Sequence, residues 1–516
     1  MNKKKTVALF LAFCVSFSLF SGCKKNQDSV NIAVYTEGMK YTETTKGTAS
    51  PVYAISYEIM GGEEVMPIGG FYAPFTSGGS LDGHTLPNFV SEEYYQKIAD
   101  CGINMFVYSI DRWNAGGDKY NTNLVKALDL CEEFGIGYFV DAWWTRGQLG
   151  SQTEDYPLDE MIMTSDGENK ELEDLVNEIS ADGNRKGFIG MLSFDEPFTA
   201  QLDNLGVFSD AFYGLETTKK NGYDLYLNAR GYWAGVDNFW GYSDPMEFDD
   251  YIRQFFDEVK PRMLSVTQYP FTSANTPDVN ITALLTNQLQ VAREYAQEYN
   301  IPFWRMMQAG GQWNDAAAWI DTVDPYPSEG EMLFDVNMSL AYGAKAIQYF
   351  PLIQPQYFAN QTGGTYDFAN RNGLIGADGN LTRWYYYAQR ANKQVQAVDH
   401  VLMKAANEGV IVHGEDATRV IVTNGEERNT ILKENTFRQL TSVEGDDCII
   451  GCFDYKGGTA LYVVNYSRTE KADVTLRFDK SDYLYEVIQR AQSGKFVGNA
   501  VPLKLDAGEG ALIVLA

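Results

Sequence analysis

The chain has 516 residues, of which 45% are apolar and 14% aromatic, which suits one large domain together with a smaller one. Its 41 basic and 69 acidic residues give a formal net charge of −28, which disfavours nucleic acid as a partner because no basic surface is available to neutralise phosphates. With three histidines and no Cys-x-x-Cys, a zinc site is not expected, and because no Asp-rich loop has calcium spacing, no metal site is predicted.

Residues 1–22 have the pattern of a targeting segment, with three lysines followed by an apolar run at 7–20 that is too short to span a membrane comfortably. The segment ends in "LFSGC", in which two small residues precede Cys23. This pattern resembles the bacterial lipoprotein signal. The resemblance implies that Cys23 is acylated and that lipid holds the protein on a bacterial membrane, outside the cytoplasm. An ordinary secreted protein with a chance cysteine is the alternative.

Residues 23–65 form a polar tether followed by an N-terminal strand and loop segment. From Met66 onward, short apolar runs alternate with longer segments of helical period. The pattern predicts eight strands, at 67–72, 104–109, 137–142, 188–194, 224–229, 263–268, 303–308 and 345–350.

Helices are predicted after each of these strands. Ser91 is a suitable N-cap for the first, with acidic residues at its positive end. Leu124, Leu128 and Cys131 lie on one face of the second, which stops near Gly135. The other six are expected at 171–181, 199–220, 247–259, 279–300, 329–342 and 382–402.

Eight strand–helix alternations within residues 66–408 predict an α/β fold, a (β/α)₈ TIM barrel. An open doubly wound sheet is the runner-up, but the glycine fingerprint that cradles a phosphate is missing after the first strand. From 409 to 516 the helical period disappears, and short strands separated by turn residues predict an all-β sandwich. These strands read "GVIVHG", "TRVIVTN", "CIIGCF", "TALYVVNY", "DVTLRF", "YEVIQR" and "ALIVLA".

A (β/α)₈ barrel carries its active site at the C-terminal ends of its strands. Asp195 and Glu196 stand at the end of the fourth predicted strand and Asp141 near the end of the third. Aromatic rings beside acids and amides suit a sugar, whose apolar faces stack while its hydroxyls need hydrogen-bonding partners. The candidates for binding such a substrate are Tyr72, Trp143, Trp144, Asn228, Tyr269, Gln308, Trp313 and Tyr349.

The stretch "GFIGMLSFDEP" resembles the fourth strand of the (β/α)₈ glycoside hydrolases that include the family 42 β-galactosidases and the family 5 glycanases. In those enzymes the strand ends in Asn-Glu, often followed by Pro, and the Glu is the general acid/base. The stretches "AYGAKAIQYF" and "ALYVVNYS" are similar to their eighth strand and C-terminal sandwich. The resemblance implies hydrolysis of O-glycosidic bonds in a carbohydrate without a cofactor, with Glu196 as proton donor. Burial and the adjacent Asp195 are expected to raise the pKa of Glu196.

The sequence departs from this pattern at the seventh strand, "FWRMMQAGGQW", where Gln308 stands in place of the nucleophilic Glu of the retaining enzymes. An amide cannot form a covalent glycosyl-enzyme. The identity of the second catalytic group, and with it the stereochemical outcome, is therefore open.

Three interpretations remain. In substrate-assisted hydrolysis, similar to the family 20 hexosaminidases, Asp195 orients a 2-acetamido group and Tyr269 or Tyr349 steadies the intermediate. Since neighbouring strand residues point to opposite faces, this pairing needs a bend at 194–197. In the second interpretation another acid is the base or nucleophile, Asp141 being favoured over Asp111, Glu329 and Glu331. In the third, the chain is a non-catalytic glycan-binding lipoprotein.

Overall fold

The computed structural model describes residues 31–34, 40–43, 50–76, 80–81, 84–111, 113, 119–142, 170–231, 248–271, 278–311, 327–355, 372–423, 428 and 430–515. Two short strands, β1 (Asn31–Val34) and β2 (Lys40–Glu43), pair antiparallel near the N-terminus. The targeting segment, Cys23, Trp143, Trp144 and Trp313 lie outside the described residues.

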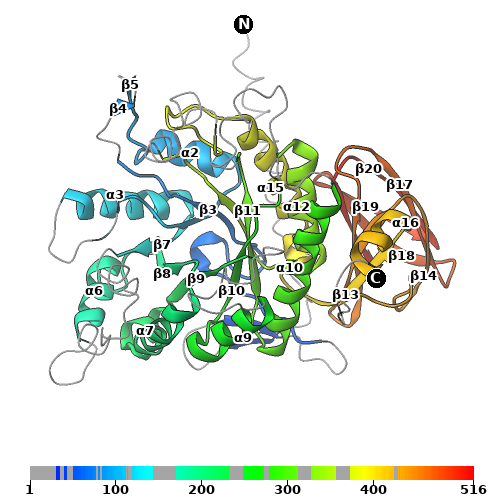
Figure 1. Cartoon of the computed structure of the whole chain (residues 1–516), viewed down its shortest axis with the longest axis horizontal. Coiled ribbons are helices and arrows are strands. Elements are labelled where there is room, and N and C mark those ends of the chain that lie inside the picture. The colour runs from blue at the N-terminus through cyan, green and yellow to red at the C-terminus, as the bar shows by residue number, and fades with distance from the viewer. Residues whose placement is uncertain are drawn as a thin grey trace, which may run out of the picture.

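Eight parallel strands close into a barrel, which confirms the predicted fold class (Figure 1). Going round the barrel, the order is β10-β11-β12-β3-β6-β7-β8-β9. Every predicted barrel strand is present, with bounds shifted by at most two residues. The observed strands are β3 (Ile68–Phe71), β6 (Met105–Val107), β7 (Gly137–Asp141), β8 (Phe188–Asp195), β9 (Asp224–Ala229), β10 (Leu264–Thr267), β11 (Phe303–Gln308) and β12 (Ile347–Phe350).

Helices surround the barrel, and each predicted helix is found. They are α2 (Glu92–Asp100), α3 (Lys119–Phe134), α6 (Lys170–Ser180), α7 (Leu202–Gly214), α8 (Glu216–Asn221), α9 (Phe248–Val259), α10 (Asp278–Glu298), α12 (Glu329–Ala341) and α15 (Arg383–Leu402). The segment 199–220, predicted as one helix, is divided into a 3-10 turn (Thr199–Gln201), α7 and α8. The division after α7 lies at Leu215, whose backbone is extended (φ −64°, ψ 139°).

Along each strand, side chains point alternately into the interior of the barrel and outward to the layer beneath the helices. Phe139, Tyr226 and Trp304 fill the interior and contact one another through their rings. The segment that precedes β3 packs into the same core through Ile55 and Tyr57, so that it plugs the end of the barrel where the strands begin. The opposite end of the barrel, where the strands end, is where a (β/α)₈ barrel carries its active site.

A sandwich of two antiparallel sheets follows the barrel, as predicted. One sheet has the order β13-β15-β16-β21-β18-β19 and the other β14-β17-β20. Their bounds are β13 (Ala405–His413), β14 (Leu440–Gly445), β15 (Cys448–Tyr455), β16 (Gly458–Asn465), β17 (Ala472–Phe478), β18 (Tyr483–Gln489), β19 (Gln492–Gly498), β20 (Ala500–Leu505) and β21 (Gly510–Leu515).

One predicted strand of this region is wrong. The stretch "TRVIVTN" forms a π-helix over Thr418–Thr423 instead. Its adjacent residues Val420 and Ile421 are both buried while Val422 is exposed, a pattern that a strand with alternating faces does not give. Cys448 and Cys452 are buried thiols, and so are Cys101 and Cys131.

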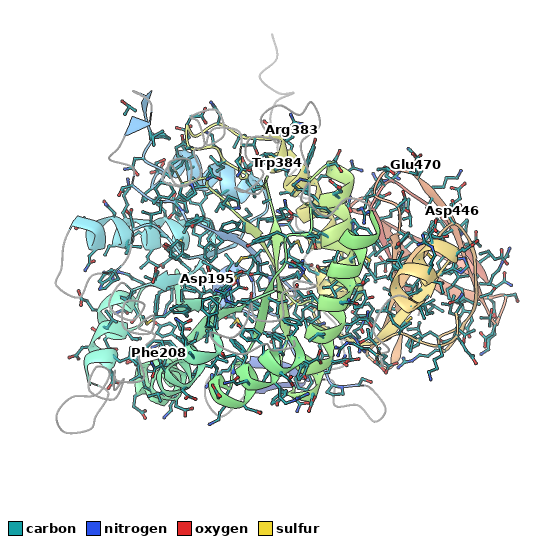
Figure 2. The ribbon with its side chains drawn as sticks, viewed as in Figure 1. Asp195, Phe208, Arg383, Trp384, Asp446 and Glu470 are labelled. Atoms are coloured by element: carbon teal, nitrogen blue, oxygen red, sulfur yellow. The ribbon has the colours of Figure 1, made fainter. Side chains whose placement is uncertain are left out.

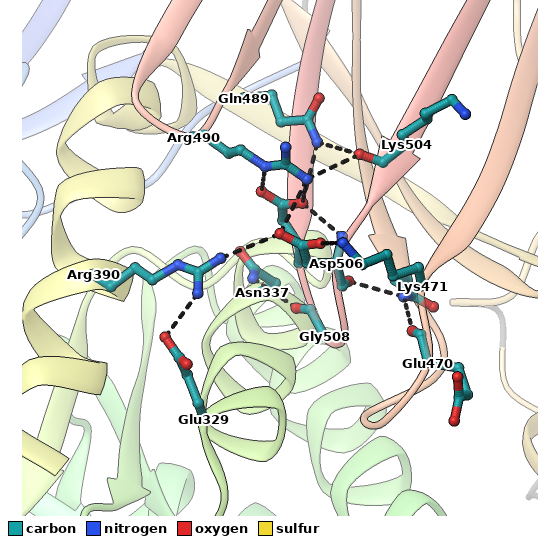
Figure 3. A network of polar contacts seen from close by, with 12 residues as sticks. Glu329, Asn337, Arg390, Glu470, Lys471, Gln489, Arg490, Lys504, Asp506 and Gly508 are labelled. Atoms are coloured by element: carbon teal, nitrogen blue, oxygen red, sulfur yellow. Dashed lines mark hydrogen bonds and ion pairs between the residues drawn. The ribbon is translucent and has the colours of Figure 1, made fainter. Parts of the chain in front are cut away.

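A polar network fastens the sandwich to α12 and α15 (Figure 3). Arg390 of α15 pairs with Glu329 at 2.8 Å and with Asp506 at 3.5 Å. Arg490 pairs with the same Asp506 at 3.1 Å and with the buried Glu509 at 2.7 Å. Because Asp506 serves both arginines, helix and sandwich are held in one fixed relation. In the part of the chain that the structure describes, no helix is both long enough and apolar enough to cross a membrane.

Candidate active site

The backbone bends sharply where β8 ends. Glu196 has a left-handed conformation, with φ of 53°, that is uncommon for any residue other than glycine. Its N–H donates to the carbonyl of Asn228 on the neighbouring strand at 2.8 Å, and the Pro197 carbonyl accepts a hydrogen bond from Tyr251 at 2.9 Å. The bend that adjacent catalytic acids require is therefore present.

Glu196 has a raised pKa. Although part of the residue remains exposed, burial of its carboxyl is the main cause, and the negative charge of Asp195 adds to it, so that the pKa of Glu196 rises to about 7. The Arg230 guanidinium and a hydrogen bond with the Thr267 side chain act in the opposite direction. A carboxyl of this kind is partly protonated at neutral pH, which is the property a general acid needs.

Arg230 is fixed beside this carboxyl. Its Nε donates to the carbonyl oxygen of Glu196 at 2.9 Å, and its guanidinium carbon lies 3.7 Å from the centre of the Phe198 ring. The arginine thus stabilises the left-handed turn of the backbone and moderates the pKa of the acid with its charge.

A polar layer crosses the barrel interior next to Asp195, the last residue of β8, which is labelled in Figure 2. Asn228 donates to Asp195 Oδ1 at 3.1 Å and also to the Thr267 hydroxyl. Its own amide oxygen accepts from Ser265 at 2.9 Å. Asn228 is therefore brought together with Asp195 and its amide orients that carboxylate, whereas the residue was predicted to bind substrate and its side chain is fully buried.

Tyrosines line the same end of the barrel. Tyr72 directly follows β3 with φ of 68°, Tyr108 directly follows β6 with φ of 60°, and their ring centres lie 5.0 Å apart. Tyr72 also contacts Phe350, on which Tyr269 stacks at 5.3 Å. Three residues that follow barrel strands, Tyr72, Tyr108 and Glu196, thus share the left-handed conformation.

Tyr269 lies close to both candidate acids. Burial raises its pKa first, and the charges of Glu196 and then Asp195 raise it further. Sequence reasoning found Tyr72 and Tyr269 but missed Tyr108 and Phe350. The signal for these two was their position at the ends of the second and eighth strands, which is the criterion that selected the others.

Asp141 is the last residue of β7 and stands two residues after Phe139, whose ring fills the barrel interior. Because alternate strand residues point to the same side, the side chain of Asp141 lies on the interior face as well. The residue is fully buried, and its main-chain carbonyl accepts from Trp113 N–H at 2.9 Å. It occupies the strand next to that of Asp195, at the same end of the barrel.

Other acids considered as base or nucleophile have structural partners. Asp111 accepts from the N–H and hydroxyl of Thr76 at 2.7 and 2.8 Å. Glu331 closes the capping box of α12 by accepting from Ser328 N–H at 2.7 Å, and Glu329 pairs with Arg390. These contacts explain why the three acids stand where they do, so no catalytic role is needed to explain them. Across the described ranges no group of three or more His, Cys, Asp or Glu side chains is arranged to hold a metal ion.

Gln308 links two loops. Its carbonyl oxygen accepts from Phe271 N–H at 3.0 Å, and its amide nitrogen donates to the carbonyls of Phe271 and Gly310 at 2.8 and 2.9 Å. Both N–H groups of the amide are thus engaged by the main chain, instead of being presented to a substrate as predicted.

Tyr349 does not belong to the site, contrary to prediction. It is fully buried, and its hydroxyl donates to Asn392 of α15 at 2.7 Å. Its neighbour Phe350 packs with the interior core, and since adjacent strand residues point to opposite sides, Tyr349 faces the helical layer.

Among solved structures, the chain is similar to a glycoside hydrolase of family 5 from Bacteroides vulgatus, with 12% identity, a TM-score of 0.47, and coverage of 94% of this chain and 93% of that one. It is also similar to a second glycoside hydrolase, with 12% identity, a TM-score of 0.46, and coverage of 94% and 96%. A third is the GH51 arabinofuranosidase of Xanthomonas axonopodis pv. citri, with 9% identity, a TM-score of 0.41, and coverage of 88% and 96%. No protein-family model and no curated protein sequence matches the chain.

Proposed function

We propose that the protein is a glycoside hydrolase in which Glu196 is the general acid. The observation that carries this proposal is a carboxyl with a pKa of about 7 at the end of the fourth barrel strand, where the backbone is held in a left-handed conformation. A protonated Glu196 donates its proton to the glycosidic oxygen, so that the leaving sugar departs as an alcohol. The adjacent rings of Tyr72, Tyr108 and Tyr269 offer apolar faces to a sugar.

A second carboxylate must complete the reaction, since Gln308 cannot be a nucleophile. In one course, Asp141 activates the water that attacks the opposite face of the sugar, and the configuration at the anomeric carbon is inverted. The support for this role is that Asp141 ends the strand next to β8.

The alternative course is substrate-assisted. In it the carbonyl oxygen of a 2-acetamido group attacks the anomeric carbon while Glu196 protonates the leaving oxygen. Asp195 orients the amide, and water then opens the cyclic intermediate. One observation favours this course: burial raises the pKa values of Tyr226 and Tyr269, and the charges of Asp195 and Glu196 both add to the effect, so both carboxyls lie near these two tyrosines.

The test is hydrolysis of a panel of aryl glycosides and of plant and host glycans, N-acetylhexosaminides included, by the wild type and by Glu196→Gln. Cleavage that falls by about 10² or more in the variant supports the general acid. Preferential cleavage of N-acetylhexosaminides selects the substrate-assisted course, and the anomer released, followed by NMR, identifies inversion.

A non-catalytic glycan-binding protein is the competing function. Its aromatic surface is the same, but it predicts no cleavage of any panel member and glycan binding that is unchanged in Glu196→Gln. That combination would overturn the hydrolase.

We also propose that lipid attached to Cys23 anchors the protein to a bacterial membrane, outside the cytoplasm. The support is the sequence "LFSGC" behind a basic and apolar segment. Expression in a bacterial host with labelled palmitate tests it: the wild type is expected to carry label in the membrane fraction and Cys23→Ser to carry none. Equal labelling of both would refute the anchor.

A further inference from the structure

A cavity of about 630 Å³ lies where the barrel meets the sandwich. Phe303 and Lys345, at and just before the first residues of β11 and β12, line it from the barrel, and Asn407 of β13 lines it from the sandwich. The cavity therefore lies at the end of the barrel where the strands begin, opposite Glu196. Its volume is in the range of sites that hold small molecules.

Two buried cations border this cavity in a chain with a net charge of −28. Lys345 is 5% exposed and Arg293 is 6% exposed. Lys345 donates to the carbonyls of Leu402 and Ala405, and Arg293 donates to Asn407 and Thr430. Within the described residues, neither cation has a carboxylate at ion-pair distance.

Glu408 also lines the cavity, and the charge of its carboxylate is balanced by an arginine. Glu408 pairs with Arg438 at 2.8 Å and accepts from Ser50 at 2.6 Å. Burial lowers the pKa of Lys345 to about 7 and that of Arg293 to about 10, although the charge of Glu294 acts in the opposite direction on Arg293. The lining thus carries two basic groups that no described carboxylate pairs with directly.

Tyr342 supplies a second, independent observation. Its side chain is fully buried and lines the cavity, and its hydroxyl has no hydrogen-bond partner within the part of the chain that the structure describes. Tyr342 lies close enough to Arg293 for the two side chains to influence each other's pKa. A buried hydroxyl is normally satisfied, so an unsatisfied one near Arg293 is a vacant hydrogen-bond donor in a cavity lined by basic groups.

We propose that this cavity binds a small organic anion, a sugar acid or sugar phosphate, whose negative group contacts Arg293 and the Tyr342 hydroxyl, while Lys345 adds a second basic group to the lining. The carboxylate or phosphate accepts from both donors, which places a negative charge beside Arg293 and satisfies the hydroxyl in one step. Asn300 and Gln297, whose side chains also bond to Tyr53 and to the Asn407 carbonyl, border the space for the remaining hydroxyls of such a ligand, and Tyr53 and Phe437 border the space for its apolar faces. The site is independent of Glu196 and of the reaction proposed for it.

Calorimetric titration of the protein with sodium glucuronate, glucose 6-phosphate and neutral glucose tests the proposal. Either anion is expected to bind at least about tenfold more tightly than glucose, since hydrogen bonds to charged groups are the stronger kind. The relative affinity of glucuronate and glucose 6-phosphate identifies the carboxylate or the phosphate as the preferred group. No binding of either anion, or equal binding of glucose, overturns the proposal.

Tyr342→Phe decides where the anion binds. This variant removes a hydroxyl that bonds to none of the described residues, so the melting temperature should not fall, while anion affinity should fall by about tenfold. Tyr349→Phe is the matched control: its hydroxyl bonds to Asn392 outside the cavity, so the melting temperature should fall and anion affinity should not. Unchanged affinity in Tyr342→Phe overturns the site, as does an equal loss in Glu196→Gln, which would place the anion in the active site.

Discussion

The two ends of the barrel each contain a buried carboxyl with a raised pKa, and they differ in what surrounds it. Where the strands end, burial and then Asp195 raise the pKa of Glu196 to about 7. Where the strands begin, burial raises the pKa of Asp224 to about 6 against the lowering effects of Arg262 and Tyr57. Asp224 also borders a cavity, of about 580 Å³. A raised pKa beside a cavity is therefore not sufficient to mark a catalytic acid.

The partners of the two carboxyls separate their roles. Asp224 accepts from the Tyr57 hydroxyl at 3.0 Å, and Tyr57 belongs to the segment that plugs the barrel. Glu196 has a like-charged neighbour in Asp195 and a left-handed backbone, both of which cost stability. An arrangement that lowers the stability of the folded state is typical of functional sites. The hydrogen bond that Asp224 accepts from Tyr57 instead stabilises the fold, which is what a structural residue does.

The largest expected effect comes from changing each acid to its amide. Glu196→Gln removes the proton donor and should lower kcat/KM by about 10²–10⁴ on any glycoside that the wild type cleaves. Asp224→Asn makes the same chemical change at the other end of the barrel and should leave kcat/KM within about threefold, since it does not touch the reacting atoms. Initial rates on one aryl glycoside, with melting temperatures to show that both variants are folded, measure the contrast. If Asp224→Asn lost as much activity as Glu196→Gln, the assignment of the two ends would be wrong.

The second effect is on stability and belongs to Asp224. Because its folded-state pKa is raised above the unfolded value of 3.8 to about 6, the folded protein binds more protons between these pH values, and the free energy of unfolding falls as pH rises through that window. Asp224→Asn removes this dependence, so its stability relative to wild type should improve by about 3 kcal/mol between pH 3 and pH 7. Urea unfolding of both proteins at several pH values provides the measurement. A relative stability that does not change with pH would show that Asp224 titrates normally.

The third effect separates the two catalytic courses. Asp195→Asn removes the charge that raises the pKa of Glu196, so the basic limb of the pH profile of kcat/KM should move to lower pH. In the substrate-assisted course the rate on N-acetylhexosaminides should also fall by about 10² or more, since the amide of the substrate loses its orienting partner. With Asp141 as base, the loss is about tenfold or less. A basic limb that does not move would mean that Asp195 does not influence the acid.

Sequence reasoning recovered the barrel because each of its elements is marked locally. The runs that became β9 and β11 are apolar, bounded by turns and separated by helical periods, and these were placed to the residue. The acids were found by a positional rule, since the end of a strand such as β8 is where a (β/α)₈ barrel presents side chains. The same rule indicated Asn228, which lies beside Asp195 through the register of β8 and β9.

The remainder depends on contacts that a sequence does not display. Tyr349 was assigned to the site because it lies near the end of a strand, but the inward face of β12 is set by its register with β11, which places Phe350 opposite Gln308. The left-handed turn at Glu196 is held by the Asn228 carbonyl and by Arg230, both on another part of the chain. The π-helix at 418–423 replaces a predicted strand because Val420 and Ile421 are buried together. Tertiary packing decides each of these cases.

The smallest expected effect is the sharpest test of how Glu196 is tuned. The side-chain hydrogen bond from Thr267 lowers the pKa of Glu196, opposite in sign to the effect of Asp195. Thr267→Val keeps the branched shape and removes the hydroxyl, so the basic limb of kcat/KM should move to higher pH, with the rate at the optimum changed by no more than about fivefold. The pH profiles of Thr267→Val and Asp195→Asn should therefore shift in opposite directions from that of the wild type. Thr459→Val, in the sandwich, removes another buried hydroxyl that bonds to a side chain, Gln439 at 2.6 Å, and should leave the profile unmoved. A shift of Thr267→Val to lower pH would show that the hydroxyl stabilises the protonated acid instead. The Thr267 hydroxyl would then raise the pKa of Glu196, as Asp195 does.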